Sequence, residues 1–244
     1  ARPEDMTDPR KPATGHDAEG PPQHPAVPAA TVVLLRDGSD GLEVLMLRRN
    51  SKLEFVGGMW VFPGGRVDPS DIDTDRPRDD TASARRAAVR EAAEEAGLTI
   101  NADSLVRFSH WTPPSITPRR FTTWFFVARA PAGTVTVDGG EIHAHDWFRP
   151  ADALARRNAL EIELAPPTWI TLEQLLAFDD VETALATLGG REPEFFATRF
   201  APVEGGAVAL YHGDAGYADG NPDLPGRRHR LWMMNTGWRY ERNC

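Results

Sequence analysis

The chain has 244 residues, and 41% of them are hydrophobic, which is enough to bury a full core in one domain and leave material for an extension. Its formal net charge is −9 and no stretch concentrates Lys and Arg, which argues against a nucleic acid partner because phosphate backbones are bound by clustered basic side chains. The single cysteine, Cys244, excludes an intramolecular disulfide and a cysteine metal cluster, so we expect a protein of the reducing cytoplasm. The longest apolar run, residues 26–35, is too short to span a membrane.

The first part of the chain predicts a mixed α/β arrangement. Residues 1–28 are rich in Pro, Asp, Glu and Gly and are expected to form a flexible tail. Two strands separated by a Gly-rich turn predict a hairpin over 31–48. The remaining predicted elements are strands at 59–62, 105–111, 121–130 and 141–148 and a helix at 150–157. Because these elements alternate without a strict βαβ repeat, we expect an α/β fold with a mixed sheet between helices.

The pattern changes beyond about residue 165. Helical periodicity covers 168–178 and 181–188, and strand-like stretches follow at 207–212 and 229–238. We therefore divide the chain into the tail, a main domain at 29–165, and a C-terminal extension of helices and strands, 166–244, that packs on the same domain. Two roles for this extension stay open. It completes the core, or its aromatic side chains form a lid or a dimer surface near a substrate.

The most informative stretch is the helix that carries Arg90-Glu91-Ala92-Ala93-Glu94-Glu95-Ala96-Gly97-Leu98. Residues three and four apart share one helix face, so the pattern places the three carboxylates on one side of a turn. Such a face is either a solvated surface or a binding site for a hard divalent cation, Mg²⁺ or Mn²⁺, because these ions prefer oxygen ligands. An apolar strip formed by Val89, Ala92, Ala93 and Ala96 is expected to pack on a sheet.

Together with the preceding turn, Phe62-Pro63-Gly64-Gly65, this helix resembles the signature of the Nudix hydrolases. The family box reads Gly, five residues, Glu, seven residues, then Arg-Glu-apolar-x-Glu-Glu-x-Gly-apolar. The second half matches at every fixed position. The resemblance implies an α/β/α sandwich and a metal-dependent enzyme that cleaves a phosphoanhydride.

The first half of the box departs from the family pattern, because residues 66–89 form a longer interval than the family has. Counting forward from Gly65, Asp71 takes the place of the first Glu; counting back from Arg90, Ala82 takes it. The residues 68–80 are acidic and rich in turn formers, so we interpret them as a surface loop whose acids are poor candidates for metal ligands.

The resemblance also assigns roles to individual residues. The implied metal ligands are Glu91, Glu95, the nearby Glu94 and the backbone carbonyl of Gly64. Arg90 is grouped with the catalytic residues because it is expected to hold a carboxylate by a salt bridge without touching the substrate. The general base stays open between a helix acid, for which we name Glu94, and Glu141, which precedes a strand that ends near Trp147.

The substrate is indicated by a second, narrower resemblance. The spacing of Arg49, Asn50, Glu54, Gly58 and 62–65 is similar to that of a segment in coenzyme A diphosphatases, although Leu47 replaces a Thr, Asn50 a Ser or Ala, and Glu54 an Arg. Stretches at 110–114, 119–126 and 164–169 are similar to the long-insert branch of acyl-coenzyme A diphosphatases. The residues expected to bind substrate are Arg48, Arg49, Phe62, Gly65, Arg119 and Arg120.

The favoured substrate is therefore coenzyme A or acyl-coenzyme A. Two alternatives stay open, namely a pyrophosphatase for ADP-ribose, a dinucleotide or a nucleotide sugar, and a catalytically silent sensor of a nucleotide metabolite. The expected partner is a small nucleotide-type molecule, with no nucleic acid and no membrane. A homodimer is left open.

Overall fold

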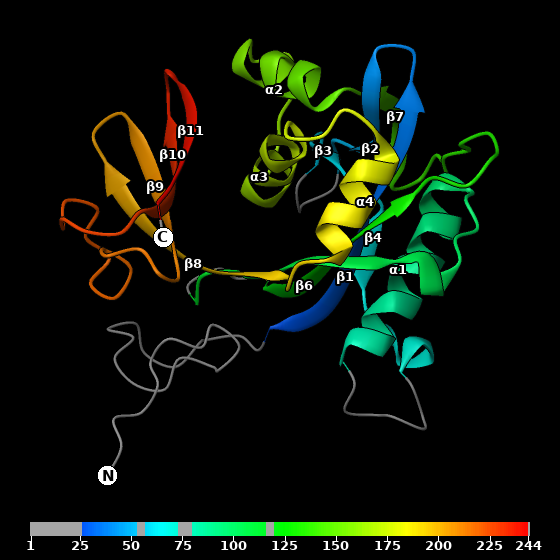
Figure 1. Ribbon diagram of the computed structural model, residues 1–244, viewed down its shortest axis with the longest axis horizontal. Helices are drawn as coiled ribbons and strands as arrows, with labels where there is room; N and C mark the ends of the chain where they lie inside the picture. The colour runs from blue at the N-terminus through cyan, green and yellow to red at the C-terminus, as the bar shows by residue number, and fades with distance from the viewer. Residues whose placement is uncertain (1–25, 53–56, 73–79, 116–119, 244) are drawn as a thin grey trace. The chain divides into compact units, whose positions relative to one another are not determined.

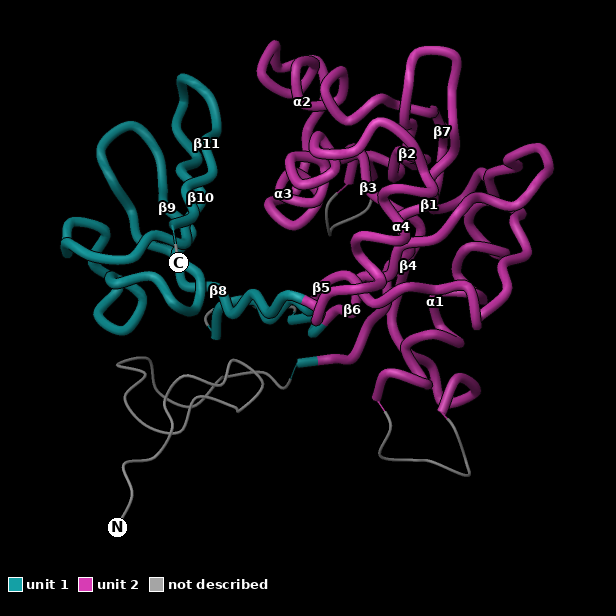
Figure 2. The backbone as a smooth tube through the Cα atoms, viewed as in Figure 1, with its two compact units in different colours: residues 1–26, 110–122, 194–244 teal, residues 27–109, 123–193 magenta. Residues whose placement is uncertain are grey.

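A computed structural model describes residues 26–52, 57–72, 80–115 and 120–243 (Figure 1). The chain forms two compact units (Figure 2). The larger comprises 27–109 and 123–193, and the smaller contains 110–122 and 194–244. The boundary that we predicted between 165 and 166 thus falls inside the larger unit. Apart from its last residues the predicted tail, 1–28, lies outside the described residues, and the first strand already begins at Val27.

The larger unit is built on a sheet in which the strand order is β6-β1-β2-β3, with β4 paired to β1 and β7 paired to β2. The bounds of the strands, of which β5 and β6 are shared between the units, are β1 (Val27–Gly38), β2 (Gly41–Arg49), β3 (Trp60–Val61), β4 (Gly64–Arg66), β5 (Val106–Thr112), β6 (Phe121–Arg129) and β7 (Ile142–Phe148). The predicted hairpin is confirmed, since β1 and β2 are antiparallel and Gly38 opposes Gly41. Gly41 has a φ of 116°, a conformation that favours glycine.

Strand β1 is buried on both faces, as expected for a strand between two layers of helices. Ala30, Val32 and Leu34 alternate into the core beneath α1 (Asp80–Ala96), whereas Val33 and Leu35 are buried on the opposite face. The other helices of this unit are α2 (Pro150–Asn158), α3 (Pro166–Leu175) and α4 (Val181–Gly189). α2 contacts β2, β7 and α3, and α4 contacts β1. The predicted α/β class, with helices on a mixed sheet, is confirmed.

Helix α1 approaches the sheet closely because its buried face is made almost entirely of alanine, namely Ala84, Ala87, Ala88, Ala92 and Ala96. Ala93, which we expected in this strip, is exposed. The helix ends at Gly97, whose φ of 67° is left-handed. The Gly97 N–H donates to the Ala93 carbonyl at 3.1 Å, which is the bond of an αL helix ending, and the Leu98 N–H donates to the Ala92 carbonyl at 3.2 Å. Two short 3₁₀ turns flank the helix, η1 (Pro69–Asp71) and η2 (Ala102–Ser104).

The smaller unit contains an antiparallel meander in the order β8-β9-β10-β11. Its strands are β8 (Glu194–Val203), β9 (Gly206–Tyr211), β10 (His229–Met234) and β11 (Gly237–Arg242). The strand predicted over 229–238 is wrong as a single element, because the chain turns between Met234 and Gly237, and β8 was not predicted. On one face Trp111 stacks on Phe196 with ring centroids 3.9 Å apart.

None of the helices in the described ranges has the length and apolar character needed to cross a bilayer.

Candidate metal and phosphate site

The turn between β3 and β4 requires its two glycines. A Cβ on Gly64 would lie 2.5 Å from the Ala30 carbonyl oxygen, and a Cβ on Gly65 would overlap the Glu91 carboxylate. The Gly64 N–H donates to Glu95 Oε2 at 2.9 Å. The turn therefore lies directly against two carboxylates of α1, residues 91 and 95, which are one helical turn apart.

Arg90 holds this region together. Its Nη1 donates to Glu91 Oε1 and to Glu94 Oε2, both at 2.9 Å, so the predicted salt bridge to a helix acid is present. Its Nη2 donates to Asp71 Oδ2 at 2.9 Å and to the Arg66 carbonyl at 3.0 Å. The Asp71 carboxylate raises the pKa of the Arg90 guanidinium, so this group stays charged. Arg90 therefore positions the acids and the turn, and its grouping with the catalytic residues stays a prediction.

The interpretation of 68–80 as a surface loop is wrong for Asp71. Its side chain is 5% exposed and lies against Arg90. The Asp68 N–H donates to Asp71 Oδ2 at 2.9 Å, which closes the η1 turn. Asp71 is the residue that forward counting from Gly65 placed at the first Glu of the box. The inserted residues therefore follow Asp71 and leave its link to the helix intact.

The three helix acids separate into two groups. Glu95 is 6% exposed and Glu91 is half-buried, whereas Glu94 is exposed and is held by Arg90. Burial and the neighbouring Glu91 charge together raise the pKa of Glu95 to about 8, although the Gly64 N–H lowers it. Burial also raises the pKa of Glu91, in spite of Arg90. Of the three carboxylates that the pattern places on one side of a turn, Glu91 and Glu95 are thus the more buried pair, and Glu94 lies at the periphery.

The donor set fits a hard divalent cation. Two carboxylates that are costly to ionise lie beside a backbone turn where no Cβ can be accommodated, and a cation would replace the protons that burial favours. In the part of the chain that the structure describes, no group of three or more His, Cys, Asp or Glu side chains is arranged to hold a metal ion by itself. The predicted carbonyl ligand at Gly64 stays a prediction, because the described contact of this residue with the acids is through its N–H.

Glu141 joins this site through Arg49 at the end of β2. Arg49 Nη2 lies 3.3 Å from Glu141 Oε2, and its Nη1 lies 3.9 Å from Glu95 Oε1. The Glu141 side chain is 63% exposed and is therefore open to solvent. One guanidinium thus links a buried box acid to the exposed acid that we predicted as a candidate base.

Two further side chains, those of Asp138 and Asn50, bind the loop before β7. We did not predict either of them as a site residue. The Asp138 carboxylate accepts the backbone N–H groups of Gly140, Glu141 and Ile142 at 3.2, 2.9 and 2.9 Å. Asn50 Nδ2 donates to the Gly140 carbonyl at 3.0 Å. The Asp-Gly-Gly turn signal at 138–140 was visible in the sequence, but its contact with Asn50, the residue after β2, was not.

The predicted substrate residues have different environments. Arg48 is exposed on β2, and Gly65 lies in the turn. Phe62 is 3% exposed and packs edge-on against Phe125, so its ring belongs to the core and is not available to a substrate. Arg120 belongs to the smaller unit, where Nε donates to the Pro114 carbonyl at 3.1 Å and Nη2 to that of Pro113 at 3.3 Å. Arg119 and Glu54 lie outside the described residues.

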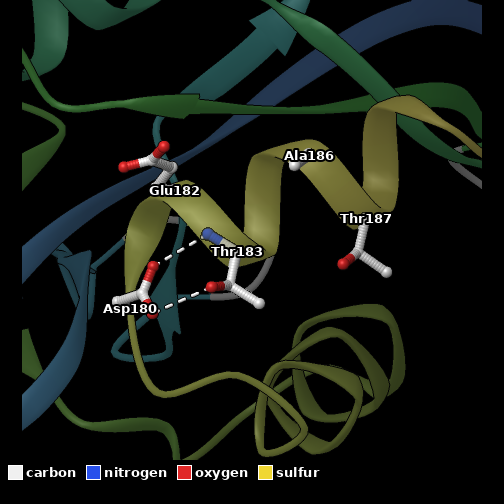
Figure 3. A pocket seen from close by; sticks show the side chains of 5 residues that line it. All are labelled: Asp180, Glu182, Thr183, Ala186 and Thr187. Carbon is white, nitrogen blue, oxygen red and sulfur yellow. Dashed lines mark hydrogen bonds between the residues drawn. The ribbon is translucent and has the colours of Figure 1, made fainter.

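A pocket on α4 is separate from these residues (Figure 3). It is lined by Asp180, Glu182, Thr183, Ala186 and Thr187. Asp180 accepts the Thr183 N–H at 2.8 Å and its hydroxyl at 2.9 Å, which is an ordinary helix N-cap. The Asp180 carboxylate therefore caps the helix.

Comparisons with known proteins agree with the box. The sequence model of the NUDIX domain matches residues 25–168, more than half of the chain. A Caenorhabditis elegans protein named "Putative nudix hydrolase 7" is 29% identical over 175 residues, which cover 56% of this chain and 57% of that protein. The peroxisomal coenzyme A diphosphatase ndx-8 of the same organism is 39% identical over 79 residues, 32% of this chain and 30% of its own length. The chain thus spans little more than half of one curated relative and less than a third of the other.

Among solved structures, a NUDIX hydrolase from Alicyclobacillus acidocaldarius is similar with a TM-score of 0.63 and 26% identity. The similarity covers 70% of this chain and all of that structure.

Proposed function

Because this chain belongs to the Nudix family, we propose that it is a metal-dependent pyrophosphohydrolase that cleaves the diphosphate of coenzyme A or an acyl-coenzyme A. The observation that carries the hydrolase proposal is the contact of Glu91 and Glu95 with the Gly64-Gly65 turn. The choice of substrate is supported by the spacing of 49–65 and by the partial similarity to a coenzyme A diphosphatase.

Glu91 and Glu95 would hold Mg²⁺ or Mn²⁺, with the Gly64 carbonyl as a further ligand. When bound, the ion would neutralise phosphoryl oxygens and lower the pKa of a water molecule. Arg90 keeps the helix acids oriented through its hydrogen bonds. Glu141 is our proposed general base: it would take a proton from the attacking water as that oxygen bonds to phosphorus and the bridging P–O bond breaks. Arg48 and Arg49 are the basic groups proposed to contact the phosphates.

A substrate panel tests the proposal. Coenzyme A, an acyl-coenzyme A, ADP-ribose, a dinucleotide cofactor and a nucleotide sugar are incubated with the protein and Mg²⁺, and the products are identified by mass. We expect coenzyme A to yield an adenosine bisphosphate and a phosphopantetheine. Cleavage of ADP-ribose or a nucleotide sugar, with coenzyme A untouched, would replace the substrate but keep the hydrolase. Binding without cleavage of any of them would favour a nucleotide sensor.

A further inference from the structure

The loop that carries Glu141 is anchored at both its backbone and its side chain. The Asp138 carboxylate accepts three successive N–H groups, those of residues 140–142. Burial of the Asp138 carboxyl opposes its ionisation, but the backbone donors outweigh this effect and lower its pKa. The turn that precedes β7 therefore stabilises the negative charge of Asp138.

Asn50 ties this turn to the end of β2. Its backbone N–H donates to the Glu141 carbonyl at 2.7 Å, and its side-chain Nδ2 donates to the Gly140 carbonyl at 3.0 Å. Its side-chain oxygen accepts the Lys52 N–H at 3.0 Å. The side-chain amide of Asn50 thus donates one hydrogen bond and accepts another, and these bonds connect the residues that follow β2 with the residues that precede β7.

Arg49, the residue before Asn50, contacts the Glu141 side chain. Arg49 Nη2 is 3.3 Å from Glu141 Oε2, so consecutive residues at the end of β2 contact the side chain and the backbone of Glu141. β2 and β7 are antiparallel, and their register is irregular between Arg48 and Arg49, where the ladder meets this loop. An exposed glutamate on a Gly-Gly turn would otherwise sample many positions, because glycine backbones are permissive.

We propose that Asn50 and Asp138 are positioning residues that fix Glu141 for proton transfer. This proposal rests on the proposed role of Glu141 as the general base. The two residues need no contact with substrate, since they act through the Glu141 backbone. A base held within a fraction of an ångström of its productive place contributes to turnover and not to substrate affinity.

The decisive experiment is a double-mutant cycle with kcat and KM measured for the substrate that the panel identifies. Asn50→Ala should lower kcat by roughly tenfold and leave KM unchanged, because only the placement of the base is relaxed. Glu141→Gln should lower kcat by roughly 10²-fold or more. In the Glu141→Gln background Asn50→Ala should have no further effect, since its only route to the reaction is already lost.

Asn101→Ala is a matched control. The Asn101 side chain also accepts a backbone N–H two residues later at 3.0 Å, that of Asp103, as Asn50 does with Lys52. Only Asn50 has the additional bond to Gly140. Asn101→Ala should leave kcat and KM at their wild-type values.

Hydrogen exchange tests the anchor without activity. In Asp138→Asn the amides of residues 140–142 should exchange faster, while those of β1 keep their wild-type rates. Unchanged exchange at 140–142 overturns the role of Asp138. The role of Asn50 is overturned if Asn50→Ala lowers kcat equally in both backgrounds, raises KM alone, or behaves like Asn101→Ala. A Glu141→Gln protein with wild-type kcat has a different meaning: it removes the base assignment in the proposed function, and the positioning role with it.

Discussion

Arg90 and Asp71 are 19 residues apart in the sequence and form a two-pronged ion pair, in which Nη2 lies 2.9 Å and Nε 3.2 Å from the two carboxylate oxygens. The pair joins the η1 turn to the middle of α1. The same guanidinium reaches Glu91 and Glu94, so Asp71 supports the acids indirectly.

Asp71→Asn should therefore weaken both the fold and the site. The substitution keeps the volume but leaves a partly buried guanidinium without its strongest partner, which should cost about 1–3 kcal/mol in free energy of unfolding. Turnover should fall as well, because Glu91 loses its fixed neighbour. Urea unfolding and kcat are the measurements. Asp68→Asn is the control, since Asp68 lies 4.0 Å from Arg90, and it should change both quantities much less.

Gly65→Ala should weaken metal binding without unfolding the protein. The added Cβ would overlap the Glu91 carboxylate, which must then turn away. We expect Mg²⁺ affinity, measured by calorimetry, to fall by at least about tenfold, equivalent to about 1.4 kcal/mol. Gly190→Ala adds the same methyl group at ordinary contact distance, 3.5 Å from the Ala186 carbonyl, and should bind Mg²⁺ as the wild type does. Equal affinity in both variants would mean that Glu91 is not a ligand.

Glu95 should make the stability of the metal-free protein depend on pH. Its pKa in the folded protein is about 8 against an ordinary value of 4.5, so folding favours the protonated form. Stability should then decrease as the pH rises from about 4.5 to about 8, by at most about 5 kcal/mol. Unfolding in the presence of a chelator would measure this slope, and added Mg²⁺ should raise the stability at high pH.

Glu95→Gln should remove that slope together with the stabilisation by Mg²⁺. Glu94→Gln is the matched control, because the Glu94 side chain is 59% exposed and its removal should leave the slope in place. A slope that persists in Glu95→Gln would assign the titration to another group.

Asp214→Asn should destabilise the smaller unit. Asp214 and Arg230 are almost fully buried, with two oxygen–nitrogen distances of 2.6 and 2.7 Å, and Asp214 also accepts the N–H groups of Gly216 and His229. Removing one partner of such a pair should cost about 3–5 kcal/mol. Hydrogen exchange of β9 and β10 measures the loss locally. Asp223→Asn, at an exposed position, should have no such effect.

The same pair predicts acid sensitivity. Burial opposes ionisation of Asp214, but Arg230 and the two backbone donors lower its pKa overall. Its stabilising contribution is therefore complete above the ordinary pKa of 3.8 and is lost as the pH falls below that value. In Asp214→Asn the smaller unit should lose this additional acid sensitivity.

Local patterns in the sequence were sufficient for the β1–β2 hairpin and for α1. A Gly-containing turn between two apolar runs predicts a hairpin, and residues that share a helix face do so whatever surrounds them. The box motif identified the family for the same reason, since its turn and its acids are each encoded within a few residues. These features depend on short-range geometry and hold before any tertiary contact is known.

Tertiary structure decided which of those residues work together. Glu91 and Glu95 are less exposed to solvent than Glu94, and Phe62 lies in the core. A motif does not encode these differences, because the exclusion of solvent depends on the whole packed unit. Asp71 and Arg90 meet across an inserted segment, and Asn50 meets the Glu141 loop from 90 residues away. β4 is only three residues long and β8 has no clear alternation, so their pairing comes from the strands beside them. Contacts between distant segments arise only when the sheet brings their ends together, and no local period records them.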